Sequence, residues 1–296
     1  MPGSSSRRDV DRADVAAFDV AGERVEVLRT LYRVMTFPRH SHDTYTLGVG
    51  LRGVGSIWCR GVSHVRRRGD IVVIPPGEVH TGGIGPHSDV LSYFAAHVPV
   101  SLFEQCAESE GVAPGRLEFL VPVLQDTLVE RALLTLERRL LPPLGTTREQ
   151  RPSSAVLAGI TSQEALTLAI AAVVRHHGGR RSSAAMHDDP MAVRTAKQVM
   201  QSCFADSSKT SLDALAAQAG ITSFHLIRTF TRSTGVSPHQ YLLQVRVERA
   251  RVLLASGEAP SVVAALTGFV DQSHLTGHFK RYVGTTPGNY QRGMRA

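Results

Sequence analysis

The stretch Thr267–Tyr290 constrains the fold of this chain most strongly. After a glycine turn at Gly268 it carries apolar residues at Leu275, Phe279 and Tyr282. Spacings of four and three residues place these side chains on one face of a helix, and polar and basic residues occupy the opposite face. A short helix with a polar outer face after a glycine turn is typical of the second helix of a helix-turn-helix unit.

An equivalent pattern occurs earlier in the chain. Ser211 is suited to cap a helix that ends before the turn at Gly220, and Ser223 is predicted to cap the next helix, which buries Leu226 and Phe230. The first helix of this unit is predicted to face inward with Leu212, Leu215, Ala216 and Ala219. In the later unit, a helix that starts at Ser261 is predicted to use Val262, Val263 and Leu266 in the same way.

A long helix is predicted between the two units. The pair Ser237-Pro238 is typical of an N-cap followed by the first helical residue, and the helix is expected to run to Ser256 and end at Gly257. Its predicted apolar face consists of Leu242, Val245, Val252 and Leu253. At about 1.5 Å per residue it spans roughly 27–30 Å. That length is close to the ~34 Å between successive major-groove faces on one side of DNA, so both units could read one face of a duplex.

The charge distribution separates the C-terminal third from the rest. Residues 190–296 contain 12 Lys/Arg and 5 Asp/Glu, whereas residues 1–189 contain 21 of each, so the whole net charge of +7 lies in the last third. A neutral region joined to a basic one indicates a polyanionic partner for the basic region. Double-stranded DNA at a promoter or operator is the partner that two helix-turn-helix units predict.

The same region resembles the tandem helix-turn-helix domain of AraC/XylS-type bacterial transcription regulators, over about residues 192–292. The resemblance rests on SLDALAAQAGITSFHLIRTFTRSTGVSP and on GFVDQSHLTGHFKRYVGTTPGNY. Together with the outward-facing positions, it predicts DNA contacts by Ser223, Phe224, His225, Ile227, Arg228, Arg232, Gln272, Ser273, His274, Thr276, Lys280 and Arg281. Arg228 can pair with guanine or a phosphate. Arg232, Lys280 and Arg281 are better suited to phosphates, which add affinity without sequence information.

One position departs from the family pattern. Gly277 stands where the family commonly has Arg, inside the second recognition helix. Glycine destabilises a helix by about 1 kcal/mol relative to alanine, and it removes a side chain that could contact DNA. We therefore expect Gly277→Arg to raise DNA affinity and to steepen its dependence on salt.

The region from Arg24 to Pro99 shows short apolar or alternating runs punctuated by Gly and Pro. These runs are Val25–Leu28, Tyr45–Val49, Ser56–Cys59, Asp70–Ile74 and Val90–Phe94. Many short strands with regular turns predict a sandwich or closed barrel rather than alternating strands and helices.

Three histidines stand out in this region. The run Arg39-His40-Ser41-His42, followed by GDIVVIPPGEVH ending at His80, resembles the two motifs of cupins, which are small antiparallel β barrels. The glutamate and the asparagine of the cupin metal pattern are missing, because His42 leads to Asp43-Thr44-Tyr45 and Ile84 stands at the later position. The histidines could bind Zn²⁺, Fe²⁺ or Ni²⁺, serve as polar groups of a pocket for an organic effector, or be structural. The effector pocket is preferred, without metal or cofactor, and its predicted residues are His40, His42, Tyr45, Glu78 and His80.

The remaining segments complete an α+β organisation. Residues 1–20 are expected to form a flexible arm, 21–110 a cupin-like sensor barrel, 111–177 helices, 178–190 a linker and 191–296 the tandem helix-turn-helix domain. In 111–177 the apolar spacing predicts one helix through Leu133, Leu136 and Leu140 and a second from Ser153 to His177. These helices either form a homodimer interface or pack on the barrel.

Taken together, these patterns predict an effector-responsive, sequence-specific transcription regulator, in the family's more common mode an activator that contacts RNA polymerase. Alternatives are a metal-dependent cupin enzyme, which only the three histidines favour, and an architectural DNA binder of low specificity. No run of about 18 apolar residues is present, and the first 18 residues lack the apolar segment of a signal peptide. The expected location is the cytoplasm, with no membrane partner and no catalytic residues.

Overall fold

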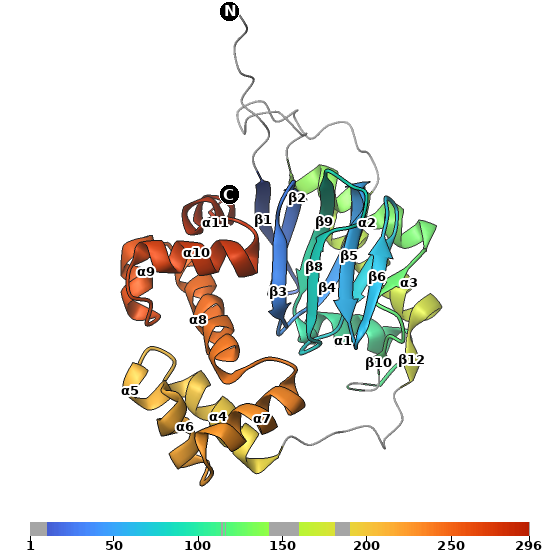
Figure 1. Ribbon diagram of the computed structural model, residues 1–296. Helices are drawn as coiled ribbons and strands as arrows, with labels where there is room; N and C mark the ends of the chain where they lie inside the picture. Colours follow the sequence, from blue (N-terminus) through green and yellow to red (C-terminus); the bar gives the residue numbers. More distant parts are fainter. Residues whose placement is uncertain (1–10, 114, 116, 142–159, 181–189, 296) are drawn as a thin grey trace, which may run out of the picture. The chain divides into compact units, whose positions relative to one another are not determined.

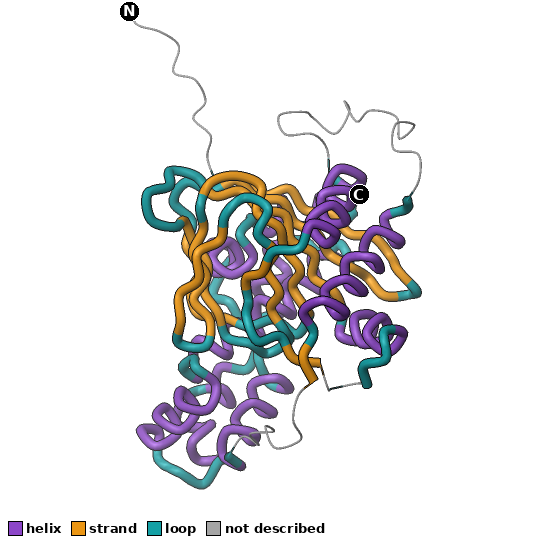
Figure 2. The backbone as a smooth tube through the Cα atoms, turned by 90° about the vertical axis from the view of Figure 1, so that its right-hand side faces the viewer, coloured by secondary structure: helices purple, strands orange, loops and turns teal. Residues whose placement is uncertain are grey.

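The computed structural model describes residues 11–113, 115, 117–141, 160–180 and 190–295. It divides into two compact units. The first comprises Met1–Thr36, Asp43–Pro76 and Gly82–Arg180, and the second comprises Phe37–His42, Gly77–Thr81 and Arg181–Ala296. Strands dominate the N-terminal half of the chain, and helices alone form its last third (Figures 1 and 2). The predicted α+β class is confirmed.

The strands are β1 (Arg12–Val20), β2 (Glu23–Leu31), β3 (Thr36–His40), β4 (Tyr45–Gly53), β5 (Gly55–Cys59), β6 (Val62–Arg66), β7 (Ile71–Ile74), β8 (His80–Ile84), β9 (Leu91–Val98), β10 (Leu117–Glu118), β11 (Val123–Leu124) and β12 (Gly179–Arg180). The helices are α1 (Val100–Ser109), α2 (Thr127–Leu140), α3 (Ser162–His177), α4 (Met191–Ser202), α5 (Ser207–Thr210), α6 (Leu212–Gln218), α7 (Ser223–Thr234), α8 (Pro238–Ala255), α9 (Pro260–Leu266), α10 (Gln272–Val283) and α11 (Pro287–Met294).

The strands form antiparallel sheets, so of the sandwich or closed barrel that the strand pattern predicted, the closed barrel implied by the cupin resemblance is not seen in the described residues. A six-stranded sheet has the order β1-β2-β9-β4-β7-β11, and a four-stranded sheet has the order β3-β8-β5-β6. The two sheets meet through Ile57 and Cys59 of β5 against Val72 and Ile74 of β7. Within the described residues no strand pairing closes either sheet on itself. Alternation and turn signals are shared by sandwiches and barrels, which is why the sequence alone did not separate them.

The predicted N-terminal arm is wrong for residues 12–20, while residues 1–10 lie outside the described residues. β1 pairs with β2 along its whole length, through a two-residue turn at Ala21-Gly22 with φ of 51° and 83°. Such turns, with φ positive at both residues, match the twist of a hairpin. The strand was missed because alanine and aspartate are poor strand formers, and only pairing with β2 overrides that preference.

Helices cover one face of the six-stranded sheet (Figure 1). Their core includes Phe103 of α1, Leu133 and Leu136 of α2, and Ile170 of α3. Buried Arg29 of β2 donates to Glu137 of α2 at 2.6 Å and to Asp14 of β1 at 2.8 Å, so an ion-pair network ties the sheet to this layer. The helices thus pack on the sheet, while the dimer interface stays a prediction.

Two boundaries in this region differ from the predictions. α3 begins at Ser162 rather than Ser153, because Thr161 and Glu164 form a capping box that fixes its start. Residues 142–159 lie outside the described residues, and they include most of the helical turns that were predicted before Ser162. Gly179–Arg180, predicted as linker, pairs with β10, and residues 181–189 are not described.

The C-terminal helices pack into two groups that share α8. One core joins Val193 and Met200 of α4 with Leu215 of α6, Phe230 of α7 and Leu242 of α8. The other group is α9, α10, α11 and the second half of α8, with Phe279 stacked edge-on against Tyr290 at 5.3 Å. Every described helix is too short or too polar to cross a membrane.

α8 was placed correctly between Ser237 and Ser256, but its predicted apolar face was only partly right, because Leu242 is buried while Val245 and Leu253 are half-buried. Val252 is 65% exposed, whereas the buried residues are Pro238, Leu242, Leu243, Arg246, Val247, Ala250 and Leu254. Because the helix is covered by different neighbours along its length, its buried side turns, and one constant apolar stripe does not describe it. In α9, Val263 is buried as predicted, while Val262 and Leu266 are about half exposed.

Candidate functional site

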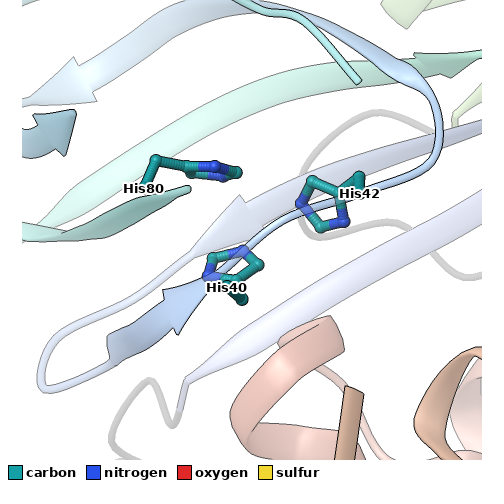
Figure 3. Close-up of side chains that lie close together, drawn as sticks. All are labelled: His40, His42 and His80. Carbon is teal, nitrogen blue, oxygen red and sulfur yellow. The ribbon is translucent and has the colours of Figure 1, made fainter. Parts of the chain in front are cut away.

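The three histidines selected from the sequence lie together. His40 ends β3, His80 begins the neighbouring strand β8, and His42 lies in the loop after β3 (Figure 3). Ring centroids are 4.3 Å apart for His40 and His80, 4.8 Å for His40 and His42, and 5.2 Å for His42 and His80. One nitrogen from each ring lies within 4.8 Å of the others. His40 and His80 are buried and His42 is half-buried.

Backbone carbonyls orient two of these rings. Nδ1 of His40 lies 2.7 Å from the carbonyl oxygen of Pro38, and Nδ1 of His80 lies 2.9 Å from that of Glu78. A carbonyl only accepts hydrogen bonds, so each Nδ1 carries a proton, and in the neutral ring the lone pair lies on Nε2. Burial lowers the pKa of His80, although the hydrogen bond to the Glu78 carbonyl opposes this shift. The neutral ring is therefore the favoured form at His80.

The other two predicted effector residues have different surroundings. Tyr45 is buried in the core on the helix-covered side of the six-stranded sheet, where its ring stacks on Phe103 at 3.9 Å and meets Phe119 edge-on. Burial raises the pKa of Tyr45 to about 12. Tyr45 is thus a core residue, and the structure does not bring it to the histidines. Glu78 reaches the cluster through its backbone carbonyl.

A second cluster with metal-ligating side chains was not identified from the sequence. Oδ2 of Asp126 accepts from Nδ1 of His176 at 2.6 Å and lies 3.1 Å from Nε2 of His177. Oδ1 of Asp126 caps α2 through the amides of Leu128 and Val129. Burial of Asp126 raises its pKa, but the hydrogen bonds from the histidines and amides prevail and lower it to about 2. The adjacent histidines at the end of α3 were a visible signal, but their partner lies 50 residues away.

In the first helix-turn-helix unit, α6 leads through Gly220, with φ of 68°, into α7. Leu226 and Phe230 are fully buried, as predicted. The capping prediction was off by one residue, because the Thr222 hydroxyl accepts from the amide of His225. Ser223 is the first helical residue, and its hydroxyl donates to Asp213 of α6. The exposed surface of α7 contains Phe224, His225, Ile227, Arg228, Thr231 and Arg232.

In the second unit, α9 leads through Gly268, with φ of 76°, into α10. Leu275, Phe279 and Tyr282 are buried as predicted, and Asp271 caps the helix through the amide of His274. Gln272, Ser273, Gly277 and Arg281 are exposed, and Thr276 and Lys280 are half-buried.

His274, a predicted DNA contact, is half-buried in a stack of rings. Its ring lies edge-on to Phe269 at 5.3 Å and to His278 at 4.7 Å, and its Nδ1 accepts from the amide of Val270. Burial lowers the pKa of His278, and the positive charge of Arg281 adds to this shift. This aromatic stack supports the start of α10 and was not predicted.

Comparisons with known proteins find one domain in the N-terminal part of the chain and another in the C-terminal part. Residues 25–163 match the model of the AraC-like ligand binding domain, and residues 215–293 match a helix-turn-helix domain model. The uncharacterized HTH-type transcriptional regulator YbfI of Bacillus subtilis is 26% identical over 85% of this chain and 86% of its own. The HTH-type transcriptional activator RhaS of Escherichia coli O139:H28 is 23% identical over 87% of this chain and 88% of its own.

A solved structure has the same fold along nearly the whole chain. The crystal structure of an apo ToxT variant from Vibrio cholerae strain SCE256 gives a TM-score of 0.53 at 12% identity, over 98% of this chain and 100% of the ToxT chain. Both halves of the chain match in the same order as in full-length regulators. The protein therefore belongs to the AraC-type transcriptional regulators, with an AraC-like ligand-binding domain followed by a helix-turn-helix domain.

Proposed function

We propose that this chain is an effector-responsive, sequence-specific transcription regulator whose two recognition helices, α7 and α10, enter the major groove of DNA. The observation that carries the proposal is the pair of capped helices, each preceded by a glycine turn and each exposing a polar or basic face in a basic region. Activation is the proposed sign of regulation, because the related RhaS is described as an activator. No catalysis is part of the proposal, since the full-length relatives are regulators.

The exposed side chains divide into two kinds of DNA contact. On α7, Arg228 and His225 carry donors that suit base edges, while exposed Phe224 suits an apolar contact such as a thymine methyl group. On α10, Gln272 has the amide that pairs with adenine. The proposed base or backbone contacts also include Ser223, Ile227, Ser273, His274 and Thr276, and the proposed phosphate contacts are Arg232, Lys280 and Arg281.

The length of α8 supports simultaneous binding by both units. Its 18 residues correspond to about 27 Å at 1.5 Å per residue. A rigid connection of this length suits two recognition helices that bind successive major grooves about 34 Å apart. The capping box of Ser237 and Gln240 fixes the start of α8, so the beginning of the connection is well defined.

The N-terminal region is proposed as the effector sensor, with residues 191–296 as the DNA-binding domain. His40, His42 and His80 are its proposed ligand-binding groups, and α2 and α3 are proposed to contribute to a homodimer interface. Effector binding can alter regulation only if the effector has different affinities for two arrangements of the protein. RNA polymerase is the proposed partner at the promoter.

Genome-wide recovery of DNA bound by the full chain tests this function, followed by fluorescence anisotropy on a recovered site and a shuffled site at fixed salt. We expect the recovered site to bind at least about 1,000-fold more tightly than the shuffled one, as specific regulators do. Arg228→Ala is expected to reduce that ratio. Arg292→Ala on α11 removes the same charge from an exposed position and should leave the ratio unchanged. Equal affinity for both sites would instead favour an architectural binder.

A further inference from the structure

We propose that His40, His42 and His80 bind a first-row divalent transition-metal ion, with Zn²⁺ as the test ion. The inference gives the sensor's ligand a chemical class and to that extent rests on the proposed function. It departs from the expectation of a metal-free pocket. The observation behind it is the convergence of three imidazoles, with one nitrogen from each ring within 4.8 Å of the others (Figure 3).

Local backbone structure fixes the positions of the three rings. His40 and His80 lie at the ends of hydrogen-bonded strands, β3 and β8, so their separation is set by the sheet. The loop that carries His42 is tied to the turn before β8, because the amide of Gly77 donates to the carbonyl of His42 at 2.8 Å. Gly77 has φ of 73°, a conformation that glycine adopts without strain. The cluster is thus held by backbone contacts before any ligand binds.

The orientation of the rings suits metal binding. Histidines that bind metals usually donate their second ring N–H to a carbonyl or carboxylate, which fixes the tautomer and makes the coordinating nitrogen more basic. His40 and His80 have this arrangement, with Nδ1 facing the carbonyls of Pro38 and Glu78. Their Nε2 atoms are therefore the proposed coordinating atoms.

The three ligands also select the class of ion. Imidazole nitrogens suit Zn²⁺, Cu²⁺, Ni²⁺ and Fe²⁺, whereas Ca²⁺ and Mg²⁺ require oxygen ligands. Three neutral ligands leave the full double charge on the ion, and a tetrahedral ion keeps one position open. The site would therefore accept an additional ligand with an anionic or carbonyl oxygen, which gives an effector a direct point of attachment.

The cluster of Asp126, His176 and His177 provides an internal comparison. It also brings three metal-ligating groups within 4.8 Å, but both histidine nitrogens already face the same carboxylate oxygen at 2.6 and 3.1 Å. These contacts are hydrogen bonds to one carboxylate, which account for the cluster without a metal. It therefore supplies a histidine outside the proposed site as a control.

The test is a Zn²⁺ titration of the tag-free full chain against a chromophoric chelator, with Co²⁺ absorption as a second measurement. We expect each chain to bind one equivalent of Zn²⁺, and we expect the absorption spectrum of bound Co²⁺ to be that of an ion with nitrogen ligands. His42→Ala should weaken Zn²⁺ binding by about 100-fold or more, because one of three protein ligands is lost. His177→Ala should leave the affinity unchanged. His42 is half-buried, so its replacement is less disruptive to folding than that of His40 or His80.

Three outcomes would overturn the inference: no stoichiometric Zn²⁺ binding, equal affinity of wild type and His42→Ala, or loss of binding in His177→Ala. Fluorescence of Trp58, the single tryptophan, checks that each variant is folded. DNA binding is measured on the same samples with Zn²⁺ and with chelator. A protein that binds its DNA site but no Zn²⁺ refutes the metal site alone, whereas one that binds Zn²⁺ but no specific DNA refutes the proposed function alone.

Discussion

The two helix-turn-helix units share one backbone plan but differ in the surface of their second helices. Each has a glycine with positive φ in its turn, a side-chain N-cap, and a recognition helix of 12 residues closed by a left-handed glycine. α7 exposes a large aromatic side chain, Phe224, at 76%, and also Arg228. α10 has the bare backbone of Gly277 in the middle of its surface, and its cations lie in its last turn.

The two helices therefore share the residues that determine folding and differ in the residues that would contact DNA. Buried positions agree closely, with Leu226 and Phe230 in one helix matched by Leu275 and Phe279 in the other, each fully buried. The exposed positions carry different chemistry, so the same fold can read bases with one helix and bind mainly phosphates with the other. We infer that the first unit contributes more of the specificity and the second more of the general affinity.

The largest expected effect is on stability, and it tests whether the buried residues that the two units share are equally important. Phe230→Ala and Phe279→Ala should each destabilise the helical unit by about 3–5 kcal/mol, because both rings are fully buried. Denaturation followed by far-UV circular dichroism reports mainly on the helices, while Trp58 on β5 reports on the sheets. We expect a shift in the helical transition and little change at Trp58. A cost for one phenylalanine well below that for the other would mean that the units are not packed equivalently.

The second prediction concerns the exposed difference. Arg228→Ala should cost about 1–3 kcal/mol in binding to the specific site and relax the preference at one base pair. Arg281→Ala should instead weaken binding to all sequences alike and reduce the salt slope by about 1. Anisotropy titrations on specific and shuffled DNA at several salt concentrations measure both. Identical behaviour of the two variants would remove the proposed division of labour.

The helical third was largely predictable because its signals are local. N-caps, glycine turns and spacings of three and four residues lie within one or two turns of helix, and they located Leu275, Phe279 and Tyr282 correctly. The buried side of α8 was not predictable in the same way. Arg246 is buried because its Nε donates to the carbonyl of Phe204, 42 residues earlier, and no local pattern reveals such a partner.

The N-terminal region shows the same limit. The resemblance of the HxH and PPGEVH segments found His40, His42 and His80, which the fold brings together. Tyr45 was wrongly grouped with them because strand residues alternate between faces, and the sequence does not say which face meets the helices. The pairing of β1 with β2 and the contact of Asp126 with His176 also depend on the assembled fold.

A smaller expected effect distinguishes the two N-caps. Thr222→Ala and Asp271→Ala should each cost about 0.5–2 kcal/mol, because each removes an acceptor for an amide at the helix start. At low salt, Asp271→Ala should lower the free energy of unfolding more than Thr222→Ala does, because a carboxylate also interacts favourably with the helix dipole, by about 0.3–1 kcal/mol. Added salt should reduce the difference. Denaturation at two ionic strengths measures it, with Thr222→Ser as the control that keeps the hydroxyl.

The smallest effect tests the position where the units differ most. Gly277 is exposed, and a Cβ built on it meets no atom within 4 Å, so side chains fit there. Gly277→Ala should stabilise α10 by up to about 1 kcal/mol through helix propensity alone. Gly277→Arg should add a phosphate contact as well, which steepens the slope of log affinity against log salt by about 0.9. Comparing Gly277→Arg with Gly277→Ala separates the effect of the added charge from that of helix propensity, because both changes remove the glycine. If the two variants show the same salt slope, residue 277 does not face DNA, and the low specificity assigned to α10 needs another cause.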